Sequence, residues 1–133
     1  MSGAGPRAAF YALSDAGARG AYADLLAVSP QRTVFAGLVY ADAVCSAFGM
    51  TGRIALATGA EGEPGIGAVL FEKQRGPFRQ AVVPPLTPYT GPLFSGGAET
   101  AERIRTFLAA VAARYDAVAF HLSPAVTDVR PFV

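Results

Sequence analysis

The chain of 133 residues contains little of what several classes of protein depend on. It has one cysteine, Cys45, and this excludes an internal disulfide framework. The chain also has only one histidine, His121, and one histidine with one cysteine are too few ligands for a zinc site. No apolar run approaches the ~20 residues that a membrane-spanning helix needs, and residues 1–7 lack the apolar centre of a signal peptide. We therefore expect a cytoplasmic protein with no metal site and no membrane contact.

An excess of charge of either sign is also missing. The 11 basic and 10 acidic residues give a net charge of +1 and form no runs. The basic residues are nearly all arginine, and Lys73 is the only lysine. This balance predicts neither a nucleic-acid surface nor a polybasic membrane patch.

Apolar residues, in contrast, are abundant. They make up 52% of the chain, which is long enough for one domain with its own core. So apolar a composition indicates that part of the surface is buried against something else. The last residues, 127–133, end in an apolar Pro-Phe-Val and do not resemble a natural ending. We expect one lobe over residues 1–133, the first part of a longer protein cut after Val133.

The first half of the chain predicts a strand and two helices. Residues 9–13 form the expected strand, and residues 19–28 form a helix that Pro30 stops. Thr33 is the expected N-cap of a second helix that reaches Phe48, with Gly49 at its end. The expected apolar face of this helix is Val34, Leu38, Ala41, Cys45 and Phe48. Cys45 is therefore interpreted as a small buried hydrophobe.

The second half predicts most of a sheet. Residues 53–58, 66–74 and 78–83 are strand-like and separated by turns, which indicates an antiparallel meander. A helix over 98–115 then leads into a strand over 117–122, and such a crossover gives a parallel pair. The expected fold is α/β (α+β), with a mixed sheet flanked by helices. The expected apolar face of the last helix is Ala101, Ile104, Phe107, Leu108, Val111 and Tyr115.

A proline-rich loop over residues 84–94 lies between the meander and the last helix. Its four prolines fix the backbone in a stiff, extended form. Thr87, Tyr89 and Thr90 stand between these prolines. They belong either to a rigid connector or to the wall of a substrate site. Both alternatives stay open from the residues alone.

The order of elements, with several short segments, resembles the first half of the GNAT acyltransferase fold, in its FemAB-like branch. The resemblance covers residues 28–133. The segments that carry it are Ser29-Pro30, Thr33-Val34-Phe35, Ala68-Val69-Leu70-Phe71, Lys73-Gln74-Arg75-Gly76, Val83-Pro84-Pro85-Leu86-Thr87, Tyr89-Thr90-Gly91, Leu122-Ser123-Pro124 and Asp128-Val129-Arg130-Pro131-Phe132.

This resemblance implies an N-acyltransferase with two lobes in tandem, of which this chain is the N-terminal one. The reaction implied is transfer of an acyl or aminoacyl group to an amine acceptor, either a small molecule or one like a peptidoglycan precursor. This lobe is expected to contact the acceptor through Thr87, Tyr89, Thr90 and His121, and to be inactive alone. Acetyl-CoA or another acyl donor is expected in the second lobe.

The residues themselves also argue against a cofactor in this lobe. A pyrophosphate site needs free backbone amides at a helix start. Here prolines remove donors, and Glu99 and Glu102 in the first turn of the last helix would repel phosphate. Ser95-Gly96-Gly97 is therefore interpreted as a helix-start turn.

Other candidates are weaker. His121 is either a base facing a cleft or a hydrogen-bonded strand residue. Glu61 and Glu63 fit a solvated turn better than a catalytic pair. A second hypothesis is a binding module that pairs with another chain or itself through the open sheet edge after Leu122. A third is a small complete acyltransferase that becomes active as a dimer.

Overall fold

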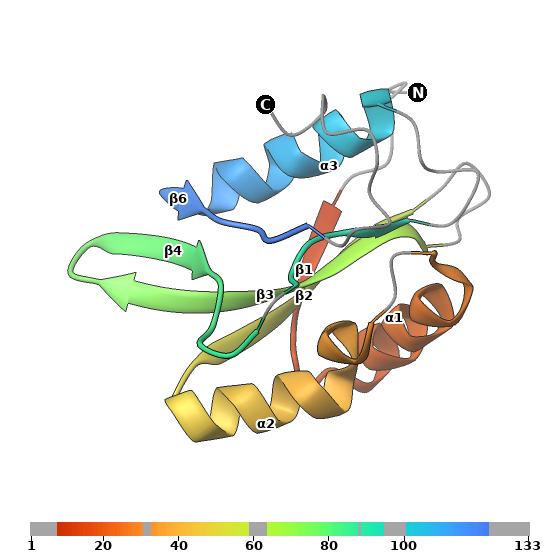
Figure 1. Cartoon of the computed structure of the whole chain (residues 1–133). Helices are drawn as coiled ribbons and strands as arrows, with labels where there is room; N and C mark the ends of the chain where they lie inside the picture. The colour runs from red at the N-terminus through yellow and green to blue at the C-terminus, as the bar shows by residue number, and fades with distance from the viewer. Residues whose placement is uncertain (1–7, 31–32, 59–63, 88, 95–100, 123–133) are drawn as a thin grey trace.

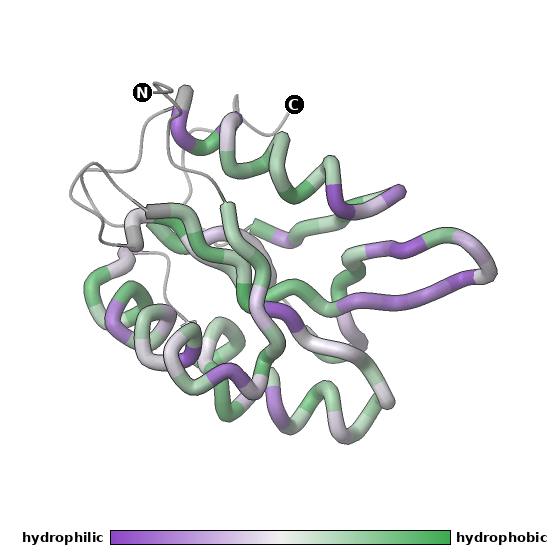
Figure 2. The backbone as a smooth tube through the Cα atoms, turned by 180° about the vertical axis from the view of Figure 1, so that it is seen from behind, coloured by the Kyte–Doolittle hydropathy of each residue, from purple (hydrophilic) through white to green (hydrophobic). Residues whose placement is uncertain are grey.

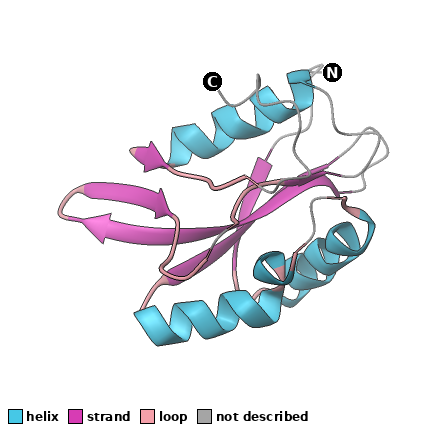
Figure 3. Ribbon diagram, viewed as in Figure 1, coloured by secondary structure: helices cyan, strands magenta, loops and turns pink. Residues whose placement is uncertain are grey.

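The computed structural model describes residues 8–30, 33–58, 64–87, 89–94 and 101–122. They form an α+β fold in which three helices flank a six-stranded mixed sheet (Figures 1 and 3). The elements are β1 (Ala8–Ala12), α1 (Ala16–Val28), the 3₁₀ helix η1 (Val34–Ala36), α2 (Leu38–Phe48), β2 (Thr51–Thr58), β3 (Pro64–Arg75), β4 (Phe78–Val82), β5 (Leu93–Phe94), α3 (Ala101–Arg114) and β6 (Ala117–Val118).

The sheet separates two apolar cores. Its strand order is β1-β2-β3-β4-β6. The short strand β5 pairs with β3 on the same edge as β4. Helices α1 and α2 cover one face and α3 covers the other (Figure 1). Alternate residues of β3 serve the two cores: Ala68 and Leu70 face α3, while Val69 and Phe71 face α1 and α2. β3 is therefore covered on both faces, which suits its largely apolar run from Ile66 to Phe71.

The meander and the crossover are confirmed. Neighbouring strands from β1 to β4 pair antiparallel, and β6 pairs parallel with β4 after the chain has passed through α3. Four of the residues expected on the apolar face of α3 are buried, namely Ile104, Phe107, Val111 and Tyr115. The last strand is shorter than predicted, because only Ala117 and Val118 of the expected 117–122 are paired as strand.

The prediction for the second helix is wrong at its start. Thr33 precedes a 3₁₀ turn rather than an α-helix, and its side chain makes no capping hydrogen bond. Gly37 is extended (φ −72°, ψ 152°), so α2 begins only at Leu38. The end is as expected, because Gly49 closes the helix in the left-handed conformation at φ 63°. The first helix also begins earlier than predicted, because Asp15 accepts a hydrogen bond from the Ala18 amide at 2.9 Å.

This break changes which side chains α2 buries. Val34 is 73% exposed and Phe48 is 45% exposed, although both were expected on the buried face. Val44 is buried in their place, beside Ala41. Cys45 is half-buried against the core that α1 and α2 share with the sheet. The α2 face therefore leaves an exposed aromatic ring at its C-terminal end.

The fourth strand of the sheet is interrupted by the proline-rich segment. The last β3–β4 pair is Phe71 with Val82, and the nearest β3–β5 pair is Gly67 with Leu93. Gly67 and Phe71 are four residues apart on β3, whereas their partners Leu93 and Val82 are eleven residues apart. The fourth strand therefore contains an insertion of seven residues between β4 and β5. The segment passes toward α2 before it returns to the sheet as β5 (Figure 1). It is an excursion within a strand, whereas the sequence predicted a connection from strand to helix.

Some predictions fall on residues outside those described. They concern Glu61 and Glu63, the turn at residues 95–97, Glu99, and the segment 123–133. Within the described part of the chain, no helix is long and apolar enough to cross a membrane.

Candidate functional site

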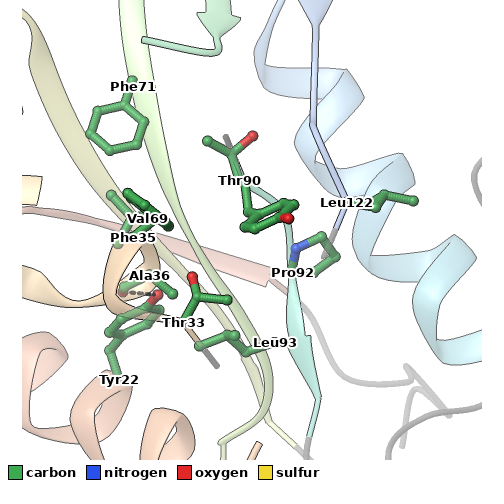
Figure 4. A pocket seen from close by; sticks show the side chains of 12 residues that line it. Tyr22, Thr33, Phe35, Ala36, Val69, Phe71, Thr90, Pro92, Leu93 and Leu122 are labelled. Atoms are coloured by element: carbon green, nitrogen blue, oxygen red, sulfur yellow. Dashed lines mark hydrogen bonds between the residues drawn. The ribbon is translucent and has the colours of Figure 1, made fainter. Parts of the chain in front are cut away.

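A small pocket lies where the fourth strand is interrupted. Its walls come from η1, from β3 and from residues 89–93, with Leu122 on the far side (Figure 4). The lining residues are Tyr22, Thr33, Phe35, Ala36, Val69, Phe71, Tyr89, Thr90, Gly91, Pro92, Leu93 and Leu122. The pocket therefore depends on five separate segments of the sequence, including α1 through Tyr22.

The pocket is narrow and uncharged. About 20 Å³ is open to the centre of a water molecule, which is room for one water. None of the described lining residues is acidic or basic, and the polar groups are hydroxyls. The hydroxyl of Tyr22 donates to the carbonyl of Ala36 at 2.6 Å, so it is already used (Figure 4). Burying an unpaired charge is costly, so the pocket suits a small neutral group.

Thr90 and His121, both predicted as site residues, lie side by side. The Thr90 amide donates to the His121 carbonyl at 2.8 Å, and the His121 amide donates to Thr90 Oγ1 at 3.1 Å. This pairing fixes one wall of the pocket. The His121 side chain is exposed and does not line the pocket. Its position favours the interpretation as a hydrogen-bonded residue at the strand end over that of a base in the pocket.

Tyr89, the third predicted residue, contributes an aromatic wall. Its ring meets Phe35 edge-on, with 6.2 Å between the ring centroids. Phe35 in turn meets Tyr40 edge-on at 5.1 Å. Such edge contacts each contribute roughly 0.5–1.5 kcal/mol. The three rings connect the proline-rich segment to η1 and α2.

Thr87, the fourth predicted residue, faces away from the pocket. It is buried, and its hydroxyl lies 3.2 Å from the Pro85 carbonyl and 3.1 Å from the Tyr40 hydroxyl. Tyr40 also donates to the carbonyl of Leu86 at 2.8 Å. The two hydroxyl protons can satisfy two of these three contacts at one time, and the contacts of Tyr40 hold the excursion against α2. Thr87 is a connector residue, which is one of the two alternatives that the sequence left open.

Gly91 completes the wall in a backbone conformation that favours glycine. Its φ is 135°, which side chains rarely adopt. A Cβ atom at this position would lie 3.2 Å from Leu122 Cδ2. The close approach of these two segments therefore requires glycine.

The Tyr22 phenol in the pocket wall and the Cys45 thiol on α2 are both held in their neutral forms. Burial raises the pKa of the Tyr22 phenol far above its ordinary value. Burial and then the nearby Asp42 carboxylate raise the pKa of the Cys45 thiol, so this cysteine is a poor nucleophile near neutral pH. No group of metal-binding side chains occurs in the described part of the chain.

A second polar cluster lies on the other face of the sheet. Glu72 Oε1 accepts from Tyr115 at 2.7 Å and from Arg53 and Arg114 at 3.3 Å each. The Arg114 guanidinium also stacks over Phe10, 4.9 Å from the ring centroid. The Glu72 side chain is only 11% exposed, so the cluster ties β2, β3 and α3 together.

The sequence could not identify Phe35, Leu122 or Glu72 as neighbours of these sites. Phe35 lies in a 3₁₀ turn and Leu122 beyond β6, and neither has a local motif. Only the cross-strand register brings Glu72 to Arg53. Comparison of the chain with protein-family models, with curated proteins and with solved structures finds no match.

Proposed function

We propose that this chain is the N-terminal lobe of a GNAT-like, FemAB-like N-acyltransferase and supplies contacts to the amine acceptor. One observation carries the proposal: an antiparallel meander is followed by α3 and a parallel strand, and an uncharged pocket lies at the interrupted fourth strand. This is the order of elements that the family resemblance implies. The complete enzyme would transfer an acyl or aminoacyl group to an amine.

The pocket has little with which to hold an acyl-CoA. A pyrophosphate needs cations or free amides, and the described lining has no cation. The Thr90 amide is already bonded to His121, and Pro92 has no amide proton. These features support assigning the acyl donor to a second lobe.

The acceptor amine must lose a proton during acyl transfer. The described lining residues include no carboxylate and no histidine, and the Tyr22 hydroxyl is already donating its proton to a carbonyl. The general base would therefore come from outside this pocket. The role of the pocket is to position the acceptor by its neutral part, with Tyr89 and Thr90 as contacts.

The test compares two ligands on the complete 133-residue chain. Isothermal titration with acetyl-CoA is expected to give no binding. In NMR titrations with small primary amines, shifts are expected at residues 89–93, and Tyr89→Phe should weaken binding by about fivefold through the loss of one hydrogen bond. Tyr11→Phe, a change of the same kind on β1, should leave the affinity unchanged. Stoichiometric micromolar binding of acetyl-CoA, or amine shifts elsewhere, would contradict the proposal.

A second candidate is an assembly module that pairs through the sheet edge. It is favoured by β6, which ends the strand order and exposes both of its residues. Such an edge can pair with another strand. Sedimentation of the wild type and of the Val118→Lys variant distinguishes the assembly module from the acyltransferase lobe. A dimer that Val118→Lys dissociates supports assembly, whereas monomers in both cases exclude self-pairing through this edge.

A further inference from the structure

The β3–β4 hairpin projects from the body of the molecule as an arm (Figure 1). Many of the residues along this arm are hydrophilic, as the purple colour in Figure 2 shows. Lys73, Arg75 and Arg79 are exposed on it, and none of the three forms an ion pair with a described residue. Among the described residues, the acid that bonds to one of these three is Asp116, whose carboxylate accepts from the Arg79 backbone amide at 2.7 Å. The arm is therefore a local cationic surface on a chain whose net charge is only +1.

The strand period places two of these cations on one face of the arm. Phe71 faces α1 and α2, so Lys73 and Arg75, two and four residues later, lie on the same face. Phe78 pairs directly with Arg75 and is 56% exposed. Glu72, the only acid of the two strands, lies on the opposite face with Arg53 and Arg114.

A hollow lies at the base of this face, between the end of α2 and β3. It holds about 490 Å³ open to water. Its lining residues are Phe48, Gly49, Met50, Thr51, Glu72, Lys73, Gln74 and Pro85. The ring of Phe48 is 45% exposed here instead of being buried in the core. The C-terminal end of α2 is nearby and carries a partial negative charge. Phe48, Met50 and Pro85 therefore form a side of the hollow that suits an apolar side chain, whereas carboxylates suit the arm beyond it.

We propose that the hollow and this face of the arm bind an extended peptide segment of a partner protein. An apolar side chain of that segment fills the hollow, and two carboxylates at alternate positions meet Lys73 and Arg75. The two cations are two residues apart on one strand, a separation of about 6.6 Å that an extended peptide repeats. A flat bilayer cannot enter the hollow, and nucleic-acid binding uses a broader basic surface.

The test uses a capped peptide, Leu-Ser-Glu-Ser-Glu, titrated into the isotopically labelled chain. Saturable amide shifts are expected on the arm and at the end of α2. The double variant Lys73→Ala with Arg75→Ala should weaken binding by about fivefold, as expected for two exposed ion pairs. The matched control is Arg105→Ala, an exposed cation on α3 outside the arm, which should leave the affinity unchanged.

Two further measurements separate this proposal from general charge attraction. The peptide Leu-Glu-Glu-Ser-Ser has the same composition but adjacent acids, so it should bind more weakly. Lys73→Glu with Arg75→Glu should prefer Leu-Ser-Lys-Ser-Lys. Equal binding of the two acidic peptides, shifts elsewhere, or full affinity of the double alanine variant would overturn the proposal. Tighter binding of short single-stranded DNA or of anionic phosphatidylglycerol vesicles at the same residues would overturn it as well.

Discussion

At the scale of single residues, Leu86 combines two unfavourable features. Its side chain is 86% exposed, and its backbone is left-handed with φ at 60°. A bulky residue in this conformation costs about 1–2 kcal/mol. The strain persists because Tyr40 and Thr87 hold the backbone on both sides through their hydroxyls. The excursion of the fourth strand is therefore fixed by contacts with α2 rather than by its own preference.

We predict that Leu86→Asn stabilises the protein by about 0.5–1 kcal/mol, because asparagine tolerates the left-handed region. The carbonyl that Tyr40 binds is kept in this variant. Leu86→Ala is the control, since it removes the exposed side chain without relieving the backbone. It should change the free energy of unfolding by less than about 0.5 kcal/mol. Urea denaturation measures both values, and an unstable Leu86→Asn variant would contradict the strain.

Two ion pairs of different burial give a second prediction. Glu72 is 11% exposed and accepts three hydrogen bonds, whereas Asp42 is 50% exposed and pairs with Arg19 at 2.8 Å. Glu72→Gln should cost about 1.5–3 kcal/mol, as for buried bonds to a charged group. Asp42→Asn should cost under about 1 kcal/mol. Equal losses in chemical denaturation would show that the cluster at Glu72 adds no special stability.

At the scale of elements, two glycines test how tightly β3 packs against α1. A Cβ atom on Gly67 would lie 2.8 Å from Leu25 Cδ2 and 2.9 Å from Leu56 Cδ2. Gly67→Ala should therefore destabilise the protein by about 1–3 kcal/mol. Gly20, exposed in the middle of α1, has no atom within 4 Å of the same position. Gly20→Ala should stabilise by about 0.5–1 kcal/mol through helix propensity. Similar thermal shifts in both variants would contradict this contrast.

The elements also show where sequence patterns stop being informative. The apolar period correctly predicted the buried face of α3, because one continuous helix keeps one period. It failed before α2, because Gly37 breaks the helix and turns Val34 toward solvent. It also missed β5, whose two residues are too few to show alternation. Its pairing depends on β3, which is distant in sequence.

At the scale of the whole molecule, the candidate site was predictable only in part. The stiffness of the proline-rich segment left Tyr89 and Thr90 either as parts of a rigid connector or as the wall of a site, and both residues line a pocket. Thr87 has the same local pattern but is turned toward Tyr40. Local sequence gives the stiffness of a loop, whereas the packing of η1 decides which of its side chains face the pocket. The cationic arm differs, because Lys73 and Arg75 lie two residues apart on β3 and the strand period alone places them on one face.

The stability of the whole molecule should also depend on pH through its buried tyrosines. Burial, and then the hydrogen bond to Glu72, raise the pKa of Tyr115 to about 12. In an unfolded chain the phenol titrates near about 10. Below that value both states are protonated, and the stabilising contribution is complete. As the pH rises from 10 toward 12, only the unfolded state loses its proton, so the free energy of unfolding falls.

Tyr115→Phe isolates this contribution. At pH 8 the variant should be less stable by about 1 kcal/mol, because it loses the hydrogen bond to Glu72. Between pH 10 and 12 its stability should fall less steeply than that of the wild type, because the residue no longer titrates. A smaller slope remains from Tyr22, whose pKa burial also raises. Urea midpoints measured from pH 8 to 11.5 give both curves. Parallel curves above pH 10 would show that the Tyr115 hydroxyl does not hold its proton more tightly in the folded state.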